Sequence, residues 1–295
     1  MSWGSIRPVV AAEGAIRTLA FLRMAAIIAR MVHELALRLS VFLGLIALFA
    51  VWERLAPRRH LALPRAGRWM TNGALAVLDT LTLRLMALAL PVLAVGAALD
   101  AGQLGWGVFN RLDWPVWVEV VLALVVLDFA IWGQHWITHR VPLFWRFHRV
   151  HHADRDMDVT TAIRFHPVEI AASMGVKIGL VYLLGPSALA VVLFEIVLNG
   201  TSLFNHANLG LPSGLERALR RVLVTPDMHR IHHSALRREH DSNFGFALSV
   251  WDRLFGTYRA APEAGHDAMT LGLDWQDDRP ARLGWSLLLP FRGRR

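Results

Sequence analysis

The sequence predicts an all-α fold: a multi-pass membrane helical bundle of about four to five membrane-embedded helices, with a cytoplasmic, histidine-rich helical cap. Three observations support this prediction. The chain of 295 residues is 55% apolar and has a mean hydropathy of +0.39, which is high for a soluble protein. Its apolar residues gather in long runs. Most of its 14 histidines lie in the polar segments beside the later runs.

Four apolar runs are long enough to cross a membrane, which takes about 20 mostly apolar residues. They cover residues 35–52, 74–99, 114–132 and 169–204. A soluble helical bundle is the alternative, but four such runs exceed what a soluble core usually requires. The last run is broken by "LLGPS" at 183–187, where Gly-Pro predicts a turn. Histidines flank this run on both sides, so they can share a site only if the run forms a hairpin that dips in and returns.

Basic residues flank the apolar runs unevenly. The formal net charge is +8, and Lys177 is the only lysine among the 31 basic residues. Residues 54–68 contain five arginines, whereas the loop 100–113 contains only Arg111. The positive-inside rule therefore places residues 54–70, 135–168 and 205–295 in the cytoplasm and the loop 100–113 outside. This pattern argues against nucleic acid as a partner, and the absence of cysteine excludes disulfides and thiolate metal sites.

The chain is expected to divide into four segments. The first could be a lead of undecided structure or an amphipathic helix, because its apolar residues are interrupted by arginines. The second holds three transmembrane runs, the third is rich in histidine and includes the hairpin 169–204, and the fourth is a C-terminal tail. Their bounds are 1–32, 33–134, 135–260 and 261–295.

Eight histidines form three motifs that are typical of a metal site. One H-x-x-x-H and two H-x-x-H-H motifs contain His135, His139, His148, His151, His152, His229, His232 and His233. On a helix, residues three or four apart share a face, so each motif presents a fan of imidazoles. A single zinc ion takes about four ligands, so eight clustered histidines indicate two metals. His206 and His166 are the next candidate ligands. Imidazole suits iron, zinc, copper and nickel, so the spacing does not identify the metal.

Other polar residues have weaker signals. His33, His60 and His266 are isolated and are expected to be structural, as is His240. Asp128 lies seven residues before His135, so on a helix it could orient an imidazole, although it could equally be a charge inside the bundle. Asn208 could also hydrogen-bond a ligand. The arginines within the two H-x-x-H-H motifs, Arg149 and Arg230, are expected to form structural pairs.

The three motifs resemble those of the fatty acid hydroxylase / sterol desaturase superfamily of membrane di-iron oxygenases. Further segments are similar to its bacterial sterol-desaturase-like branch: "RWMTN" (68–72), "VPLFWRFHRVHHAD" (141–154), "TAIRFHPVE" (161–169), "VLVTPDMHRIHHS" (222–234) and "NFGFALSVWDRLFGTY" (243–258). The similarity covers about residues 35–260. One departure is Ser202, which stands where these lipid hydroxylases have an additional ligand one turn before the position of His206.

The resemblance implies an O2-dependent lipid hydroxylase or desaturase with residues 135–260 as its catalytic region. It implies two iron ions held by the ten histidines, with His166 as ligand or hydrogen-bond partner. It also implies an external electron donor on a separate redox partner. The substrate would be a sterol, a fatty acyl chain or a related lipid in the bilayer, and the protein would lie in the bacterial inner membrane with a cytoplasmic active site. The oligomeric state stays open.

Two alternatives remain at this point. A histidine-rich membrane protein that binds or transports metal without oxidase activity would place its ligands along the spans, near the middle of the membrane. A membrane zinc hydrolase would need a motif such as H-E-x-x-H with a general base, and the sequence has none.

Overall fold

The computed structural model describes residues 36–89, 93–113 and 115–293. The chain divides into two compact units, residues 1–44 and 45–295. The predicted lead, 1–32, lies outside the described residues, and so does His33. Within the described ranges the chain forms helices and three isolated β-bridges, without a sheet. The predicted all-α class is therefore confirmed.

Long helices precede and interrupt a set of short ones. The first described helix is Ala36–Leu55. The others are α2 Arg65–Ala89, α3 Ala94–Leu104, α4 Val116–Arg140, α5 Pro142–His152, α6 Pro167–Leu184, α7 Ala188–His206, α8 Ser213–Leu219, α9 Pro226–His232, α10 Arg237–His240, α11 Val250–Leu254, α12 Gly265–Ala268 and α13 Leu283–Leu288. Four short 3-10 turns, η1 to η4, cover Phe109–Arg111, Val159–Ile163, Arg279–Ala281 and Leu289–Phe291.

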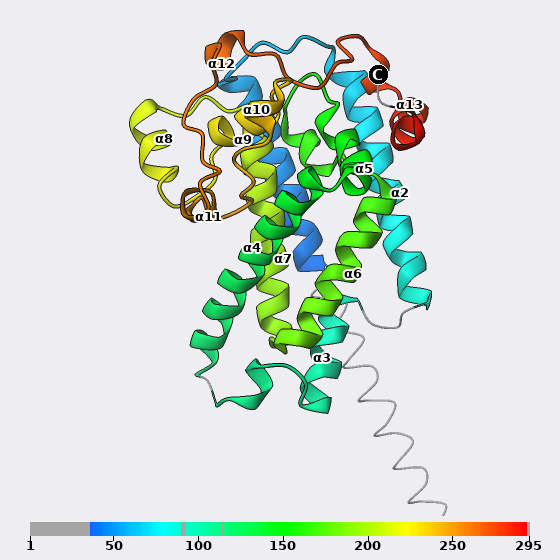
Figure 1. The fold of residues 1–295 in the computed structure, drawn as a ribbon, viewed down its shortest axis with the longest axis vertical. Coiled ribbons are helices and arrows are strands. Elements are labelled where there is room, and N and C mark those ends of the chain that lie inside the picture. Colours follow the sequence, from blue (N-terminus) through cyan, green and yellow to red (C-terminus); the bar gives the residue numbers. More distant parts are fainter. Residues whose placement is uncertain (1–35, 90–92, 114, 294–295) are drawn as a thin grey trace, which may run out of the picture. The chain divides into compact units, whose positions relative to one another are not determined.

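Over the described residues, five stretches are long and apolar enough to cross a membrane, and the second of them also includes residues 90–92, which lie outside the described ranges. They are Ala36–Leu55, Arg65–Arg111, Val116–Arg140, Pro167–Leu184 and Ala188–His206. Many of their large apolar side chains are exposed, as a lipid environment permits. Leu88, for example, is 83% exposed. These features agree with the predicted multi-pass membrane bundle. Within residues 45–295, the short helices α9, α10 and α12 gather at one end of the long ones, and α3 lies at the other end (Figure 1).

The second apolar run differs from its predicted bounds, 74–99. Helix α2 begins nine residues earlier, at Arg65, and α3 is a separate helix, while residues 90–92 lie outside the described ranges. The charged residue Arg68 can lie inside this helix because its side chain is fully buried against two carboxylates. Its Nε lies 2.7 Å from Asp154 Oδ1, and its Nη1 lies 2.6 Å from Asp158 Oδ2. The partners follow Arg68 by 86 and 90 residues, so the hydropathy pattern gives no sign of them.

The run 169–204 forms the expected helical hairpin. Helix α6 ends at Gly185, whose φ of +68° lies in the left-handed region that favours glycine. Ser187 then caps α7, and its Oγ accepts from the backbone N–H of Ala190. A side chain at Gly185 would also collide with the loop after α3, since a Cβ there would lie 2.4 Å from the Trp106 carbonyl oxygen. The hairpin returns the chain to the end of the bundle where the histidines lie.

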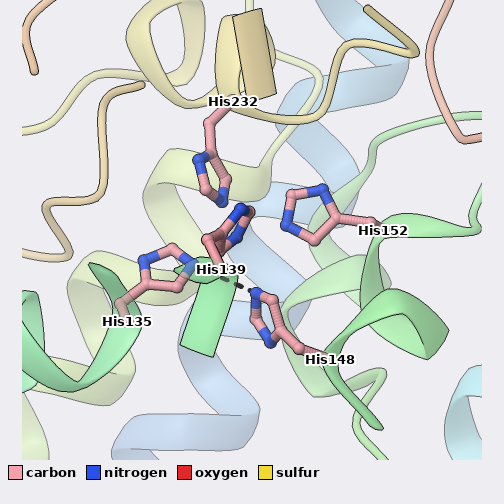
Figure 2. Close-up of side chains that lie close together, drawn as sticks. All are labelled: His135, His139, His148, His152 and His232. Carbon is pink, nitrogen blue, oxygen red and sulfur yellow. Dashed lines mark hydrogen bonds between the residues drawn. The ribbon is translucent and has the colours of Figure 1, made fainter. Parts of the chain in front are cut away.

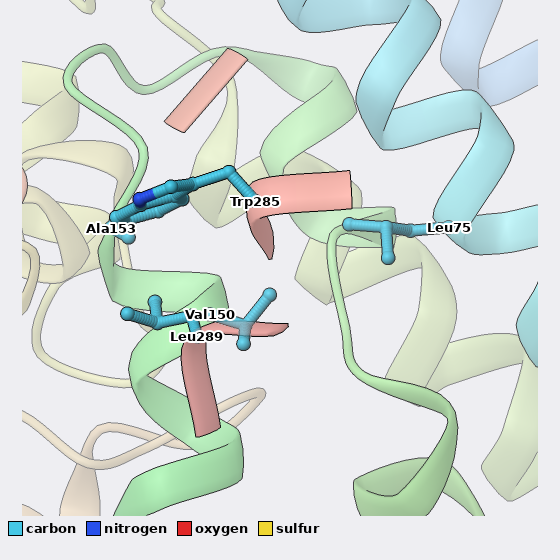
Figure 3. Close-up of a cluster of buried hydrophobic side chains, with 5 residues drawn as sticks. All are labelled: Leu75, Val150, Ala153, Trp285 and Leu289. Atoms are coloured by element: carbon cyan, nitrogen blue, oxygen red, sulfur yellow. The ribbon is translucent and has the colours of Figure 1, made fainter. Parts of the chain in front are cut away.

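The C-terminal segment packs on α5 and is more than a charged tail. Figure 3 shows Trp285 and Leu289 beside Val150 and Ala153 of α5 and Leu75 of α2, in one buried apolar cluster. This cluster holds the face of α5 that points away from the histidines. The sequence predicted only a C-terminal tail at 261–295, and this packing was not expected from it.

Candidate metal centre

Helices α4 and α5 meet at a sharp corner that brings their histidines together. His135 and His139 lie one turn apart near the end of α4. Val141 is extended, and Pro142 occupies the first turn of α5, where proline needs no hydrogen-bond partner for its nitrogen. The chain therefore turns back at once. As a result, His148 Nε2 lies 3.1 Å from His135 Nε2.

Two further elements complete the centre. Thr225 caps the short helix α9 by accepting from the Met228 N–H, and Pro226 follows at the first helical position. This cap fixes the start of the second H-x-x-H-H motif. His206 is the last residue of α7, and its Nε2 lies 3.1 Å from His151 Nε2 and 3.0 Å from His229 Nε2. The hairpin thus delivers His206 to the two motifs.

Nine of the ten predicted ligands form two buried groups. The five-histidine group consists of His135, His139, His148, His152 and His232, which converge in Figure 2. The four-histidine group consists of His151, His206, His229 and His233. Within each group, one nitrogen of every ring lies within 4.8 Å of the others, and no member is more than 5% exposed.

Hydrogen bonds to Nδ1 fix which nitrogen carries the proton in several rings. His135 Nδ1 donates to the Phe244 carbonyl oxygen at 2.8 Å, and His148 Nδ1 donates to Glu169 Oε1 at 2.6 Å. A neutral imidazole that donates from Nδ1 has only a lone pair on Nε2. In the neutral rings that a metal requires, the Nε2 atoms of His135 and His148 therefore face each other at 3.1 Å with no proton between them. Such a contact is repulsive unless a cation lies between the two atoms.

The four-histidine group repeats this arrangement. His151 Nδ1 donates to the Arg164 carbonyl oxygen at 3.1 Å, and His206 Nδ1 donates to the Ser202 carbonyl oxygen at 2.7 Å. Their Nε2 lone pairs also face each other at 3.1 Å. Two imidazoles bound to one metal at about 2.0–2.1 Å have nitrogens roughly 3 Å apart. The observed separations therefore fit a metal ion at each group.

Within the nine clustered rings, six buried nitrogens have no hydrogen-bond partner. They are both nitrogens of His139, both nitrogens of His152, Nε2 of His232 and Nδ1 of His229. An unpaired polar atom away from water is costly, so such a concentration needs an explanation. Metal coordination supplies partners for the inward-facing nitrogens.

Burial also favours the neutral form of five imidazoles outside the spans. Burial lowers the pKa of His151, His152 and His232 well below the ordinary value, and neighbouring imidazoles lower it further. The pKa values of His229 and His233 are lowered in the same way. A metal needs the neutral form of the ring. The site therefore presents its ligands ready for a cation near neutral pH.

Two carboxylates beside the five-histidine group were not predicted from the sequence. Glu169 accepts from His148 Nδ1, and Asp241 Oδ1 lies 3.4 Å from His139 Nδ1 without hydrogen-bond geometry. A carboxylate behind a metal-binding imidazole orients the ring and raises its basicity. Glu169 lies 21 residues from its partner. Its only sequence signal is that it begins an apolar run just after "RFHP".

His166 lies outside both groups, contrary to the prediction that it could be a ligand. Its Nδ1 accepts from the Val168 N–H and caps α6, and its Nε2 lies 3.3 Å from the Leu287 carbonyl oxygen. Both nitrogens thus contact the backbone. The ring directs neither nitrogen to the other histidines because it serves the start of a helix.

Asp128 and Asn208 also have different partners from those expected. Asp128 accepts from Trp251 Nε1 at 2.8 Å and from two backbone N–H groups of the same segment, and none of these partners is an imidazole. It lies two turns below His135, too far along α4 to reach the ring. The Asn208 side chain exchanges hydrogen bonds with the backbone of Arg59. Both residues position segments around the centre.

The segment "NFGFALSVWDRLFGTY" covers the five-histidine group from one side. Asp252 is fully buried and accepts from Trp132 Nε1 at 3.1 Å and from the backbone N–H groups of Phe244 and Gly245. These bonds hold the turn whose Phe244 carbonyl oxygen contacts His135. Phe255 stacks on Trp132 with ring centroids 4.6 Å apart. The segment thus supplies packing and one positioning carbonyl.

The remaining histidines and the motif arginines have structural contacts. His240 stacks on Trp145 at 5.2 Å, and its Nδ1 lies 3.1 Å from the Ser234 carbonyl oxygen. His60 is exposed, and His266 lies 3.7 Å from Asp227. Arg230 forms a buried pair with Asp227, and Arg149 donates to the carbonyl oxygens of Leu289 and Arg292.

Comparisons with known proteins agree with this geometry. The model of the fatty acid hydroxylase family matches residues 120–257, which contain all nine clustered histidines. The chain is 28% identical to the ornithine lipid hydroxylase of Rhizobium tropici over 225 residues, which are 75% of this chain and 67% of the relative. No solved structure matches the chain.

Other relatives share a shorter part. The human alkylglycerol monooxygenase is 32% identical over 146 residues, or 48% of this chain and 31% of the relative. The cholesterol 25-hydroxylase of Rattus norvegicus is 25% identical over 148 residues, or 50% of this chain and 48% of the relative. The matched region therefore spans less than half the length of these two relatives. Residues 120–257 of this chain therefore match the fatty acid hydroxylase family, and the relatives that share this region are named as lipid hydroxylases or monooxygenases.

Proposed function

We propose that this protein is a membrane-embedded di-iron oxygenase that uses O2 to hydroxylate or desaturate a C–H bond of a lipid. The observation that carries the proposal is the facing of Nε2 lone pairs at 3.1 Å in each of two buried histidine groups. The names of the relatives, which refer to ornithine lipid, alkylglycerol and cholesterol, support a lipid substrate. A sterol, a fatty acyl chain or a related lipid all fit this class.

When bound, iron would supply the reductive activation of O2 that attack on an unactivated C–H bond requires. In hydroxylation, one oxygen atom enters the C–H bond and the other leaves as water, while an external donor provides two electrons and the solvent provides two protons. We assign that donor to a separate redox protein. The nine histidines would hold the metals with neutral nitrogens, and the Nδ1 hydrogen bonds would keep the rings in place. Burial excludes water, and the absence of cysteine avoids thiol oxidation nearby.

We further propose that residues 33–134 form the transmembrane part and residues 135–260 the catalytic region, with the active site on the cytoplasmic side of a bacterial inner membrane. The arginine-rich segments beside the histidines support this orientation. A reporter fused at residue 105 and another at the C-terminus are expected to lie on opposite sides. The same side for both would contradict the orientation without affecting the proposed chemistry.

The location of the histidines favours an oxygenase over a metal transporter. A transport site lies near the middle of the membrane, along the spans. Here the candidate ligands lie at the ends of α4 and α7 and in the short helices α5 and α9. They are also enclosed, with every ring at least nine-tenths buried.

Metal analysis and lipid analysis together test the proposal. Protein purified from iron-replete aerobic cells should contain two irons per chain, as two histidine groups predict. Cells that express the protein should accumulate a hydroxylated or desaturated lipid that is absent when His148 and His151 are both replaced by alanine. Zinc alone in the purified protein, or identical lipids in both strains, would reject the function.

A further inference from the structure

An apolar cavity of about 480 Å³ lies beside the metal centre, between α4, α5 and α6. Ile137 and Val176 line it and are 41% and 46% exposed, so it opens on the flank of helices that are apolar enough to cross a membrane. In Figure 1, α4 and α6 approach α5 at the end of the bundle that carries the short helices. The cavity therefore faces the region where lipid chains would lie.

The shape of the cavity suits one extended hydrocarbon chain. Along α6 its lining runs from Val168 to Leu180, which is about 18 Å at 1.5 Å per residue. The opposite wall includes Ala130 and Gly133 of α4, whose small side chains leave the space open. A Cβ built at Gly133 meets no atom within 4 Å. The cavity is thus a slot along α6.

Two hydrogen-bond acceptors without donors lie at the end of the slot nearest the histidines. Gln134 donates from Nε2 to Ser173 Oγ at 2.9 Å, which leaves its Oε1 without a partner. Glu169 accepts from His148 through Oε1, and its Oε2 has no partner. Both residues line the cavity. The free oxygens are covered by the protein's own atoms. The terminal torsions of Glu and Gln are broad, so rotation about them changes where these oxygens point.

Unpaired acceptors in an apolar environment favour a ligand that brings a donor. Each of these oxygens is enclosed by protein atoms and would gain a hydrogen bond from an O–H or N–H group that enters the slot. A site of this kind discriminates strongly against an analogue of the same shape without the donor. An ordinary lipid tail fills the slot but leaves both oxygens unpaired.

We propose that the slot binds the chain of a membrane lipid that carries a hydroxyl or N–H donor at its inner end, and that Gln134 and Glu169 select for this donor. This inference rests on the proposed function, because it assigns the slot to the substrate. It places the donor group beside Glu169, the carboxylate that also positions His148. The substrate class is therefore a lipid with a donor group at the inner end of the bound chain.

A matched pair of probes tests the donor requirement on the full chain in lipid nanodiscs. Hexadecanol and hexadecyl methyl ether have the same apolar chain, but only the alcohol donates a hydrogen bond. Each competes with a diazirine-labelled hexadecanol, and mass spectrometry reads the labelled peptides. Labelling is expected at residues 130–138 and 168–180, and the alcohol should compete about tenfold better than the ether, the size of one hydrogen bond. Equal competition would overturn the donor requirement.

Two glycine variants test the place of binding. Gly133→Leu fills the slot from α4 and should abolish the labelling. Gly175→Leu is the matched control, because Gly175 lies on α6 outside the cavity lining and its Cβ also meets no atom within 4 Å. It should leave the labelling unchanged. Labelling that survives Gly133→Leu would place the probe elsewhere.

Two polar variants test the selecting residues. Glu169→Gln keeps the shape but can present an N–H to the slot, so it should remove or reverse the preference for the alcohol. Gln134→Met removes the amide and should weaken the preference, and it provides the test if Glu169→Gln lowers the folded yield. Glu119→Gln is the control, since that carboxylate contacts the Ser187 N–H outside the cavity. An unchanged preference in both slot variants would refute the assignment.

The outcomes also separate this inference from the function on which it rests. Protein that contains two irons and oxidises a lipid, but binds alcohol and ether equally, would refute the slot alone. Protein that contains only zinc but retains the preference for the alcohol would refute the oxygenase and leave a donor-selective lipid site.

Discussion

The two histidine groups differ in number and in what stands behind their rings. The five-histidine group has carboxylates behind it, since Glu169 holds His148 and Asp241 lies 3.4 Å from His139. In the four-histidine group, His151 and His206 each donate a hydrogen bond from Nδ1 to a backbone carbonyl oxygen. An anionic partner makes an imidazole a stronger ligand. We therefore predict that the five-histidine group holds its metal tightly. The metal of the four-histidine group should have a more open coordination shell and be lost more easily.

Removing one ligand from each group should have the largest effect. His232→Ala and His229→Ala remove a proposed ligand from the five- and the four-histidine group, respectively. Either change is expected to abolish lipid oxidation, because the proposed chemistry needs both metals. Metal content should fall from two ions to about one per chain in each variant. His60→Ala, at an exposed histidine, is the control and should retain both metals and full turnover. Full turnover in either group variant would remove that residue from the set of ligands.

Weakening the carboxylate support should have the next largest effect. Glu169→Gln is expected to lower the metal affinity of the five-histidine group about 10- to 100-fold, the usual effect of losing a carboxylate behind a metal-binding imidazole. The effect is best measured by chelator competition in a His229→Ala background, in which only that group retains metal. Asp241→Asn should have a smaller effect, because its contact with His139 lacks hydrogen-bond geometry. Equal effects of the two changes would show that the local hydrogen bond does not set the affinity.

Adding a ligand to the four-histidine group should reduce the difference in metal affinity between the two groups. Ser202 lies one turn before His206 and is 8% exposed, so both residues share a helix face. Ser202→His is expected to slow chelator removal of the second metal by about tenfold and to lower lipid oxidation by filling an open position. Ser202→Ala provides the control for the loss of the hydroxyl. If metal loss from Ser202→His matches that of the control, the position does not face the metal.

The sequence predicted most of the fold, and nine of the ten histidines that it suggested as ligands lie in the two groups. Hydropathy shows apolar runs that are long enough to cross a membrane, so the hairpin at Gly185 was expected close to its observed bounds. Helix α4 continues to Arg140, eight residues beyond the predicted end of its run at 132. Histidine motifs indicate candidate ligands because imidazoles three or four residues apart on a helix share a face. The two-group partition was not predicted, because His151 and His152 are adjacent in sequence yet join different groups. Neighbours on a helix point in different directions, and only the partners across the bundle decide which group each ring joins.

Other features depend on pairs that lie far apart in the chain. The hydrogen-bond partners of Glu169 and Arg68 lie 21 and 86–90 residues away in the sequence. No periodic pattern of apolar and polar residues indicates such contacts. The expectation for Asp128 used the correct helix face but ignored distance along the axis. It also could not include the returning segment at 247–251, which supplies the actual partners. Burial of a charge was therefore predictable, but its partner was not.

The smallest expected effect concerns His166, which sequence reasoning grouped with the ligands and the structure places at the start of α6. His166→Ala removes the side-chain acceptor for the Val168 N–H, and loss of such a cap costs about 0.5–2 kcal/mol of the free energy of unfolding. Metal content and the metal affinity of both groups should stay unchanged. Denaturant titration in detergent micelles, with metal analysis of the same samples, measures both quantities.

A second substitution separates the cap from the other contact of this ring. Asn is a strong helix cap, so His166→Asn should recover the part of the stability that comes from the Val168 N–H. It cannot reproduce the contact of Nε2 with the Leu287 carbonyl oxygen, which links α6 to α13. Stability is therefore expected to rank wild type first, then His166→Asn, then His166→Ala, with His60→Ala within about 0.5 kcal/mol of wild type. Loss of one metal in His166→Ala, with no change in stability, would restore His166 to the ligands and make the two groups equal in number.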